Sequence, residues 1–199
     1  MAFSPEQLLQ LNRAWVKRKR DMDPDFFERL AGQQMPQYFW IGCSDSRVPA
    51  TEIVDVDPGE MFVHRNVGNI ASADDANFTA ALVFAVQTLR VSHIIVTGHY
   101  GCGGVRAALE PGGDGAVAQW IGPIRRHYEL RRPTLDALPD MGARCDRLCE
   151  LHVIEQVDGL SRNPTITEAW AGGQDITLHG WVYDVRDGII RPICRRCGP

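Results

Sequence analysis

The sequence at Tyr38–Arg47 reads YFWIGCSDSR and joins an apolar run to a set of reactive side chains. The run from Tyr38 to Gly42 has the length and composition of a short buried strand. A thiol, a carboxylate, two hydroxyls and a guanidinium follow it in the five consecutive residues Cys43 to Arg47. Reactive groups at the end of a buried strand are typical of the edge at which an α/β sheet opens into a crevice.

A second segment, IIVTGHYGCGG at Ile94–Gly104, has the same design. Its β-branched start predicts a central strand, because such residues pack well on a pleated surface. The strand leads into His99 and Cys102. If the two strands are neighbours, two thiols and one imidazole converge at one edge of the sheet.

The remaining pattern alternates short apolar strands with helices. We expect helices over 5–30 with a break at 21–24, over 77–89, on both sides of a glycine-rich loop at 111–115, over 146–157 and after Asn163. We expect further strands over 61–63 and 176–190. This alternation predicts an α/β fold with a central, mostly parallel β-sheet flanked by helices. We expect a single domain over 1–199, in which 1–35 form an N-terminal helical arm and 192–199 a loose tail.

Composition narrows the class of protein. The chain has 199 residues and a formal charge of −4, so nothing indicates binding to nucleic acid or to an anionic membrane. Its start, MAFSPEQLLQ, lacks the pattern of a signal peptide, and no run reaches the ~18 apolar residues of a membrane helix. We therefore expect a cytoplasmic protein, in which six cysteines indicate metal binding or burial rather than disulfides.

Two sulfurs and one imidazole nitrogen, from Cys43, Cys102 and His99, are a donor set that suits zinc. Three protein ligands would leave one tetrahedral position open, as in catalytic zinc sites. Asp45 and Arg47 are close enough in an extended segment to pair, which would keep the carboxylate ionised. Taken alone, the thiols could be buried apolar groups, the glycines a phosphate cradle and the Asp-x-Arg an ordinary salt bridge.

Three motifs together resemble the β-class carbonic anhydrases. They are CSDSR at 43–47, GEMFVHRNVGN at 59–69 and GHYGCGG at 98–104, and the similarity continues through CELHVIEQV and HGWVYDVRDG to cover roughly 24–191. The resemblance implies one Zn2+ per chain on Cys43, His99 and Cys102, with Asp45 and Arg47 as a catalytic dyad. It also implies reversible hydration of CO2 to bicarbonate and a proton, and self-association as a homodimer or homotetramer.

A subgroup of that family carries a non-catalytic bicarbonate pocket, and Trp40, Arg65 and Tyr183 match its residues. The resemblance then implies an allosteric, bicarbonate-inhibited state in which Asp45 leaves Arg47 and takes the open position on zinc. Arginine and tyrosine are suitable because both donate hydrogen bonds to an oxyanion. Core packing of Trp40 and Tyr183, with a salt bridge of Arg65, is the alternative interpretation.

Other interpretations remain open. The same site could act on COS or CS2, or the zinc could be non-catalytic, although a structural site has no need of Asp45 and Arg47. The C-x-x-C of Cys194 and Cys197 could bind a second metal, with Cys145 and Cys149 or without them, or form a redox pair; ordinary thiols on a frayed tail are favoured. His152 stands where the family often has asparagine.

Overall fold

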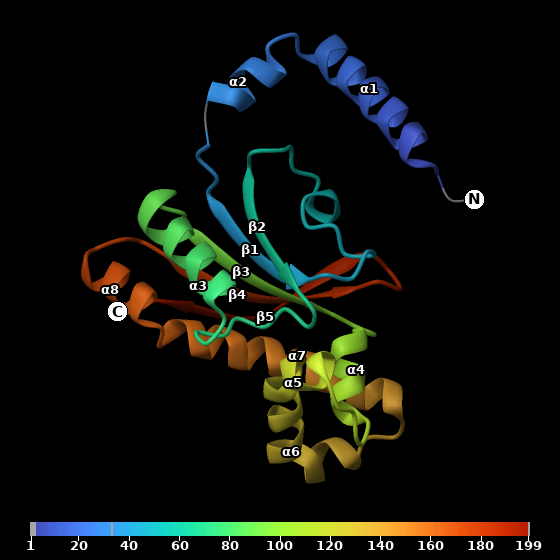
Figure 1. Ribbon diagram of the computed structural model, residues 1–199. Coiled ribbons are helices and arrows are strands. Elements are labelled where there is room, and N and C mark those ends of the chain that lie inside the picture. Colours follow the sequence, from blue (N-terminus) through green and yellow to red (C-terminus); the bar gives the residue numbers. More distant parts are fainter. Residues whose placement is uncertain (1–2, 33, 199) are drawn as a thin grey trace. The chain divides into compact units, whose positions relative to one another are not determined.

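The computed structural model describes residues 3–32 and 34–198, and divides into two compact units, Met1–Gln34 and Met35–Pro199 (Figure 1). The first unit contains α1 (Pro5–Met22) and α2 (Phe26–Gly32). α1 begins at Ser4, whose side chain forms a reciprocal capping box with Gln7. It ends at Met22, with Asp23 as its C-cap residue, inside the break that the sequence predicts. The predicted N-terminal helical arm is therefore confirmed.

The second unit is built on one five-stranded sheet with the order β2-β1-β3-β4-β5. Its strands are β1 (Tyr38–Cys43), β2 (Met61–Asn66), β3 (His93–His99), β4 (Thr177–Asp184) and β5 (Ile189–Cys197). The first four strands run parallel and β5 pairs antiparallel with β4. The predicted α/β class with a mostly parallel sheet is confirmed.

The helices that the structure describes in the second unit lie between strands along the chain. They are the 3-10 turn η1 (Glu52–Val54), α3 (Ala76–Val83), the π-helical turn η2 (Phe84–Thr88), α4 (Gly103–Leu109), α5 (Ala116–Trp120), α6 (Gly122–Asp136), α7 (Met141–Ser161) and α8 (Pro164–Ala171). Figure 1 shows α4, α5 and α6 gathered at one end of α7. Within the described ranges, no helix combines the length and the apolarity that a membrane span needs.

One part of the core lies between one face of the sheet and α3, α7 and α8. Phe39 and Ile41 of β1 and Val96 of β3 pack there against side chains of these helices. α7 approaches the backbone of the sheet closely, because β3 and β4 carry glycines beneath it. A Cβ atom at Gly98 would lie 2.7 Å from Val153, and one at Gly180 would lie 2.9 Å from the same side chain.

The predicted loose tail is wrong for residues up to Cys197, which belong to β5. Ile193 packs against the core, and Arg196 forms a 2.8 Å ion pair with Asp158 of α7. Pro192 has no N–H for the ladder, but it is tolerated because β5 is an edge strand and its pairing with β4 is irregular beside Pro192, where Ile193 has no partner in the register. Pro199 lies outside the described residues.

The two tail thiols do not form a pair. Cys194 and Cys197 are three residues apart on one strand, so their side chains project from opposite faces. The Cys194 sulfur lies over Gly180, and both thiols are free. The alternatives of a tail metal site and of a tail redox pair therefore have no support in the geometry.

Candidate metal centre

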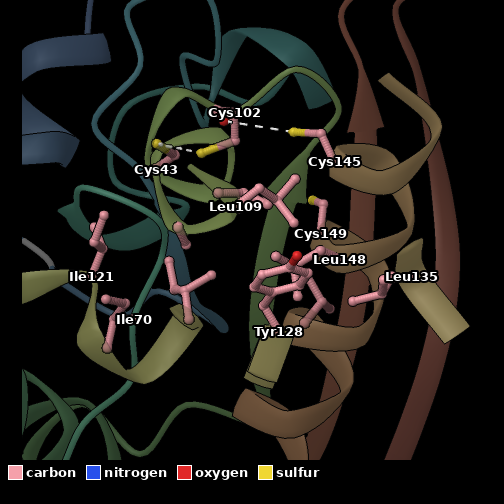
Figure 2. Packing of buried hydrophobic residues seen from close by; sticks show 14 of the residues in the cluster. Cys43, Ile70, Cys102, Leu109, Ile121, Tyr128, Leu135, Cys145, Leu148 and Cys149 are labelled. Atoms are coloured by element: carbon pink, nitrogen blue, oxygen red, sulfur yellow. Dashed lines mark hydrogen bonds between the residues drawn. The ribbon is translucent and has the colours of Figure 1, made fainter. Parts of the chain in front are cut away.

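Three potential metal ligands meet at the carboxyl ends of two neighbouring strands. Cys43 is the last residue of β1 and His99 the last residue of β3, and these strands pair in parallel. Cys102 follows a tight turn in which Gly101 takes a φ of +70°, and it is the N-cap residue of α4. The ligand atoms of all three buried residues lie within 4.8 Å of one another. The sulfurs of Cys43 and Cys102 are 3.8 Å apart, and Figure 2 shows the two side chains pointing toward each other.

The chemistry of this donor set fits zinc. Both ring nitrogens of His99 are buried, and neither has a hydrogen-bond partner within the described parts of the chain. A buried polar atom without a partner lowers the stability of the fold, so these two nitrogens indicate that a ligand binds here. Zinc prefers sulfur and imidazole nitrogen as ligands, and these three donors lie close enough to bind one ion. Because zinc is usually four-coordinate, three protein ligands leave one coordination position open.

Backbone N–H groups surround the two sulfurs. The hydrogen bond from Cys102 is the largest cause that lowers the pKa of Cys43, and the neighbouring His99 side chain and the backbone N–H groups of Gly68 and Asp45 lower it as well. The same interaction raises the pKa of Cys102, although its sulfur has the backbone N–H of Val105 nearby. The pair therefore favours a single negative charge until a cation is bound.

Two further thiols on α7 hold the backbone of the ligand residues. The Cys149 thiol donates to the carbonyl oxygen of His99 at 3.3 Å, and the Cys145 thiol approaches the carbonyl oxygen of Cys102 at 3.9 Å (Figure 2). Burial raises the pKa of both thiols, that of Cys145 to about 11. They therefore stay protonated and act as donors. Among the residues described, neither belongs to the metal-ligand group, so the four-thiol alternative is not assembled.

Asp45 lies beside the ligands and is held by Arg47. Its Oδ1 accepts hydrogen bonds from the Arg47 backbone N–H and Nε at 2.9 and 3.0 Å, and its Oδ2 accepts one from a terminal guanidinium nitrogen at 2.7 Å. This pairing keeps the pKa of Asp45 well below its usual range. Asp45 Oδ2 is 3.8 Å from His99 Nε2. The ionised carboxylate thus lies beside the ligand residues but forms its ion pair with Arg47.

The Asp-x-Arg arrangement is not itself diagnostic of a site. Asp184 and Arg186 repeat it after β4, with the same three hydrogen bonds at 2.9, 2.8 and 3.0 Å. What distinguishes Asp45 and Arg47 is their position next to the ligand cluster.

Trp40, Arg65 and Tyr183 lie on one face of the sheet, the face opposite α7. The register aligns Gly42 with Arg65 and His99 with Tyr183, and Trp40 shares the face of Gly42. The indole Nε1 of Trp40 would lie 2.4 Å from a Cβ atom at Gly42, and it is buried without an acceptor in the part of the chain that the structure describes. Arg65 donates to the carbonyl oxygens of Cys43 and Asp45 at 2.9 and 2.6 Å.

The loop 66–71, between β2 and α3, is held by side chains whose contacts no sequence pattern predicts. The bonds are Asn66 with Ile70 in both directions at 2.8 Å, Trp120 Nε1 to Val67 O at 2.7 Å, His152 Nε2 to Gly68 O at 2.9 Å, and Ala71 N to Gln156 Oε1 at 2.7 Å. The consecutive positive φ angles of Gly68 and Asn69, +81° and +46°, mark the turn. A Gly-Asn pair after a strand was the one local signal for this loop.

Comparison with known proteins gives a consistent result. Residues 38–190 match the family model described as carbonic anhydrase. A carbonic anhydrase of Emericella nidulans is 43% identical over 188 residues, which cover 94% of this chain and 82% of the relative. A tetrameric β-carbonic anhydrase of Sordaria macrospora superposes with a TM-score of 0.92 at 40% identity, covering 96% of this chain and 98% of that one.

A second solved structure, a Coccomyxa β-carbonic anhydrase in complex with acetazolamide, superposes with a TM-score of 0.94 at 35% identity, covering 99% of this chain and 90% of that one. Sequence, fold and the geometry of the ligand cluster thus lead to the same conclusion. The chain belongs to the β class of the carbonic anhydrase family.

Proposed function

We propose that Cys43, His99 and Cys102 hold one Zn2+ per chain and that the chain interconverts CO2 and bicarbonate at this site. The observation that carries the proposal is the convergence of two buried thiols and an unpartnered imidazole beside an arginine-held carboxylate. A bound zinc ion would supply the chemistry of the family, because it makes water acidic enough to be a nucleophile near neutral pH.

The protein's own groups would position the reactants. An ionised carboxylate can only accept hydrogen bonds, so Asp45 orients any O–H group that faces it and leaves the oxygen lone pairs directed elsewhere. Arg47 keeps Asp45 ionised and fixes both of its oxygens. The Arg47 side chain is 54% exposed, so this end of the site has contact with solvent, to which the released proton can pass.

We further propose that bicarbonate regulates the enzyme through Trp40, Arg65 and Tyr183. Arg65 supports this, because it bonds to the backbone of both Cys43 and Asp45. An anion that drew the Arg65 guanidinium away would loosen the segment that carries Asp45 and favour its release from Arg47. The unpaired indole N–H of Trp40 supplies another donor on the same face.

We also propose that the chain associates with itself as a homodimer or homotetramer, because the Sordaria macrospora relative is tetrameric. α1 offers a surface for it, since Leu8, Leu9 and Leu11 are 54%, 62% and 47% exposed. Light scattering on the purified chain would measure the assembly. A cytoplasmic location stays a prediction.

The decisive experiment combines zinc analysis with stopped-flow hydration of CO2. We expect one zinc per chain and CO2 hydration that disappears when a chelator removes the metal and returns when zinc is added. COS offered to the same preparation tests the alternative substrate. A preparation that holds one zinc per chain but hydrates CO2 no faster than buffer would refute the proposed catalysis; absence of zinc would refute the ligand assignment.

A further inference from the structure

One peptide unit lies between an indole and a ligand sulfur. The backbone N–H of Gly68 faces the Cys43 sulfur and lowers the pKa of that thiol. The carbonyl oxygen of the same unit belongs to Val67 and accepts a 2.7 Å hydrogen bond from Trp120 Nε1. Because a trans peptide is planar, its C=O and N–H point in opposite directions. The indole N–H of Trp120, the 67–68 peptide and the Cys43 sulfur therefore lie in series.

We propose that Trp120 is a positioning residue for the metal centre, because its indole N–H holds the 67–68 peptide in the orientation that directs the Gly68 N–H at the Cys43 sulfur. This inference rests on the proposed function, in which Cys43 is a zinc ligand. Trp120 itself touches neither the metal ligands nor the substrate in this scheme.

The surroundings of Gly68 show that this peptide is placed closely. With a φ of +81°, Gly68 has a conformation that other residues seldom adopt, and a Cβ atom there would lie 2.7 Å from Ile124 Cδ1. Its own carbonyl oxygen accepts a 2.9 Å hydrogen bond from the buried His152. His152 thus holds the peptide that follows Gly68, and Trp120 holds the peptide that precedes it.

The placement of Trp120 suits such a role. It is the last residue of α5, and it packs against the core cluster that contains Cys43 and Cys102. α5 precedes α6 directly, so the indole projects from a supported element. Groups that bond to a metal ligand orient it and tune its donor strength. Hydrogen bonds in series also polarise one another, so the indole strengthens the bond that reaches the sulfur.

The test uses Trp120→Phe, which keeps an aromatic ring and removes the N–H. Trp170→Phe is the matched control, because the Trp170 indole also donates to a backbone carbonyl, that of Ile176, at 2.8 Å. Trp120→His is the rescue variant, since its Nε2–H can overlay the indole Nε1–H. Zinc affinity is measured by competition with a chromophoric chelator. The sulfur-to-metal charge-transfer band is measured after replacement of zinc by Co2+, and melting temperatures check the fold.

We expect Trp120→Phe to bind zinc about 10-fold more weakly, at the lower end of the effect of groups that support metal ligands. Its Co2+ band should move to longer wavelength, because a thiolate with a weaker hydrogen bond gives up its electrons more easily. Trp170→Phe should match the unmodified protein, and Trp120→His should recover most of the loss.

Equal zinc affinity and an equal Co2+ band in Trp120→Phe and the unmodified protein would overturn the inference. So would a Trp120→His variant as impaired as Trp120→Phe, because the loss would then come from packing rather than from the N–H. Either result leaves the proposed function intact, whereas an unmodified protein that fails to retain zinc overturns the proposed function itself.

Discussion

The guanidinium of Arg65 donates a 2.6 Å hydrogen bond to the backbone carbonyl oxygen of Asp45. The carboxylate of Asp45 is at the same time bound by Arg47. Arg65 thus holds the backbone of Asp45, and Arg47 holds its side chain. This arrangement connects the sheet face of Trp40 and Tyr183 to the ligand cluster, and it supports the proposed regulation by bicarbonate.

Trp40→Phe should remove that regulation. The substitution deletes the buried indole N–H that has no acceptor among the described residues, and with it a donor for bicarbonate. We expect sigmoidal inhibition by bicarbonate in the unmodified enzyme and weak, non-cooperative inhibition in the variant, measured by stopped-flow CO2 hydration. Trp170→Phe serves as the control. An unchanged bicarbonate response in Trp40→Phe would count against the pocket.

Cys43→Ser and Cys102→Ser should lose zinc and reduce CO2 hydration to background. A serine hydroxyl is a much poorer zinc ligand than a thiolate, and metal affinity depends on all the ligands together. The melting temperature should also fall, because zinc that binds only the folded chain stabilises it. Cys197→Ser, at an exposed thiol, should keep its zinc. Full zinc content in either ligand variant would contradict the assignment.

Asp45→Asn should retain zinc and lose about 100-fold in kcat, at the lower end of the range for groups that manage protons. The amide removes the charge that pairs with Arg47 and adds a competing N–H donor. Asp184→Asn makes the same change in the second Asp-x-Arg turn, and it should leave kcat unaltered. Equal losses in the two variants would show that turn stability, and not the carboxylate beside the ligands, is responsible.

Stability should decrease with falling pH through His152. Burial, aided by His127, lowers the pKa of His152 to about 3, whereas an unfolded histidine titrates near 6.5. Between these values the unfolded chain takes up a proton that the folded chain refuses, so this contribution is complete above about pH 6.5 and is lost as pH falls toward 3.

His152→Gln removes the titrating ring and keeps a donor for Gly68 O. Below about pH 6, the free energy of unfolding of the unmodified protein should therefore fall by about 1 kcal/mol per pH unit more than that of the variant. Urea unfolding between pH 5 and pH 7.5 measures both slopes. Parallel slopes would show that His152 is protonated in the folded protein.

The tail thiols should behave independently. Cys197 is exposed, whereas burial raises the pKa of Cys194 and slows its reaction. We expect one fast-reacting thiol per native chain toward a disulfide reagent, and none in Cys197→Ser. A mass that shows loss of two hydrogens between Cys194 and Cys197 after mild oxidation would contradict their placement on opposite faces of β5.

Sequence reasoning succeeded where chemistry follows a strand directly. Cys43 and His99 could be placed together because parallel strands bring their carboxyl ends to one edge. It predicted the start of β5 but failed for residues 192–197 of that strand, since Pro192 and a bulge obscure the alternation that predicts a strand. The contacts of Trp120 and His152 with the loop 66–71 could not be predicted, because they span 53 and 84 residues of chain and no local pattern reports such a contact.

The glycines beneath α7 have a practical consequence for anyone who wishes to make this enzyme more heat-resistant. Replacing a strand glycine with alanine is a common stabilising move, but at Gly98 or Gly180 the new methyl group would push against Val153. The helix that would have to give way is the one whose thiols grip the carbonyl groups of His99 and Cys102. An alanine at either position would therefore displace the backbone of His99 and Cys102, and substitutions for thermal tolerance are better placed on the outward side of that helix.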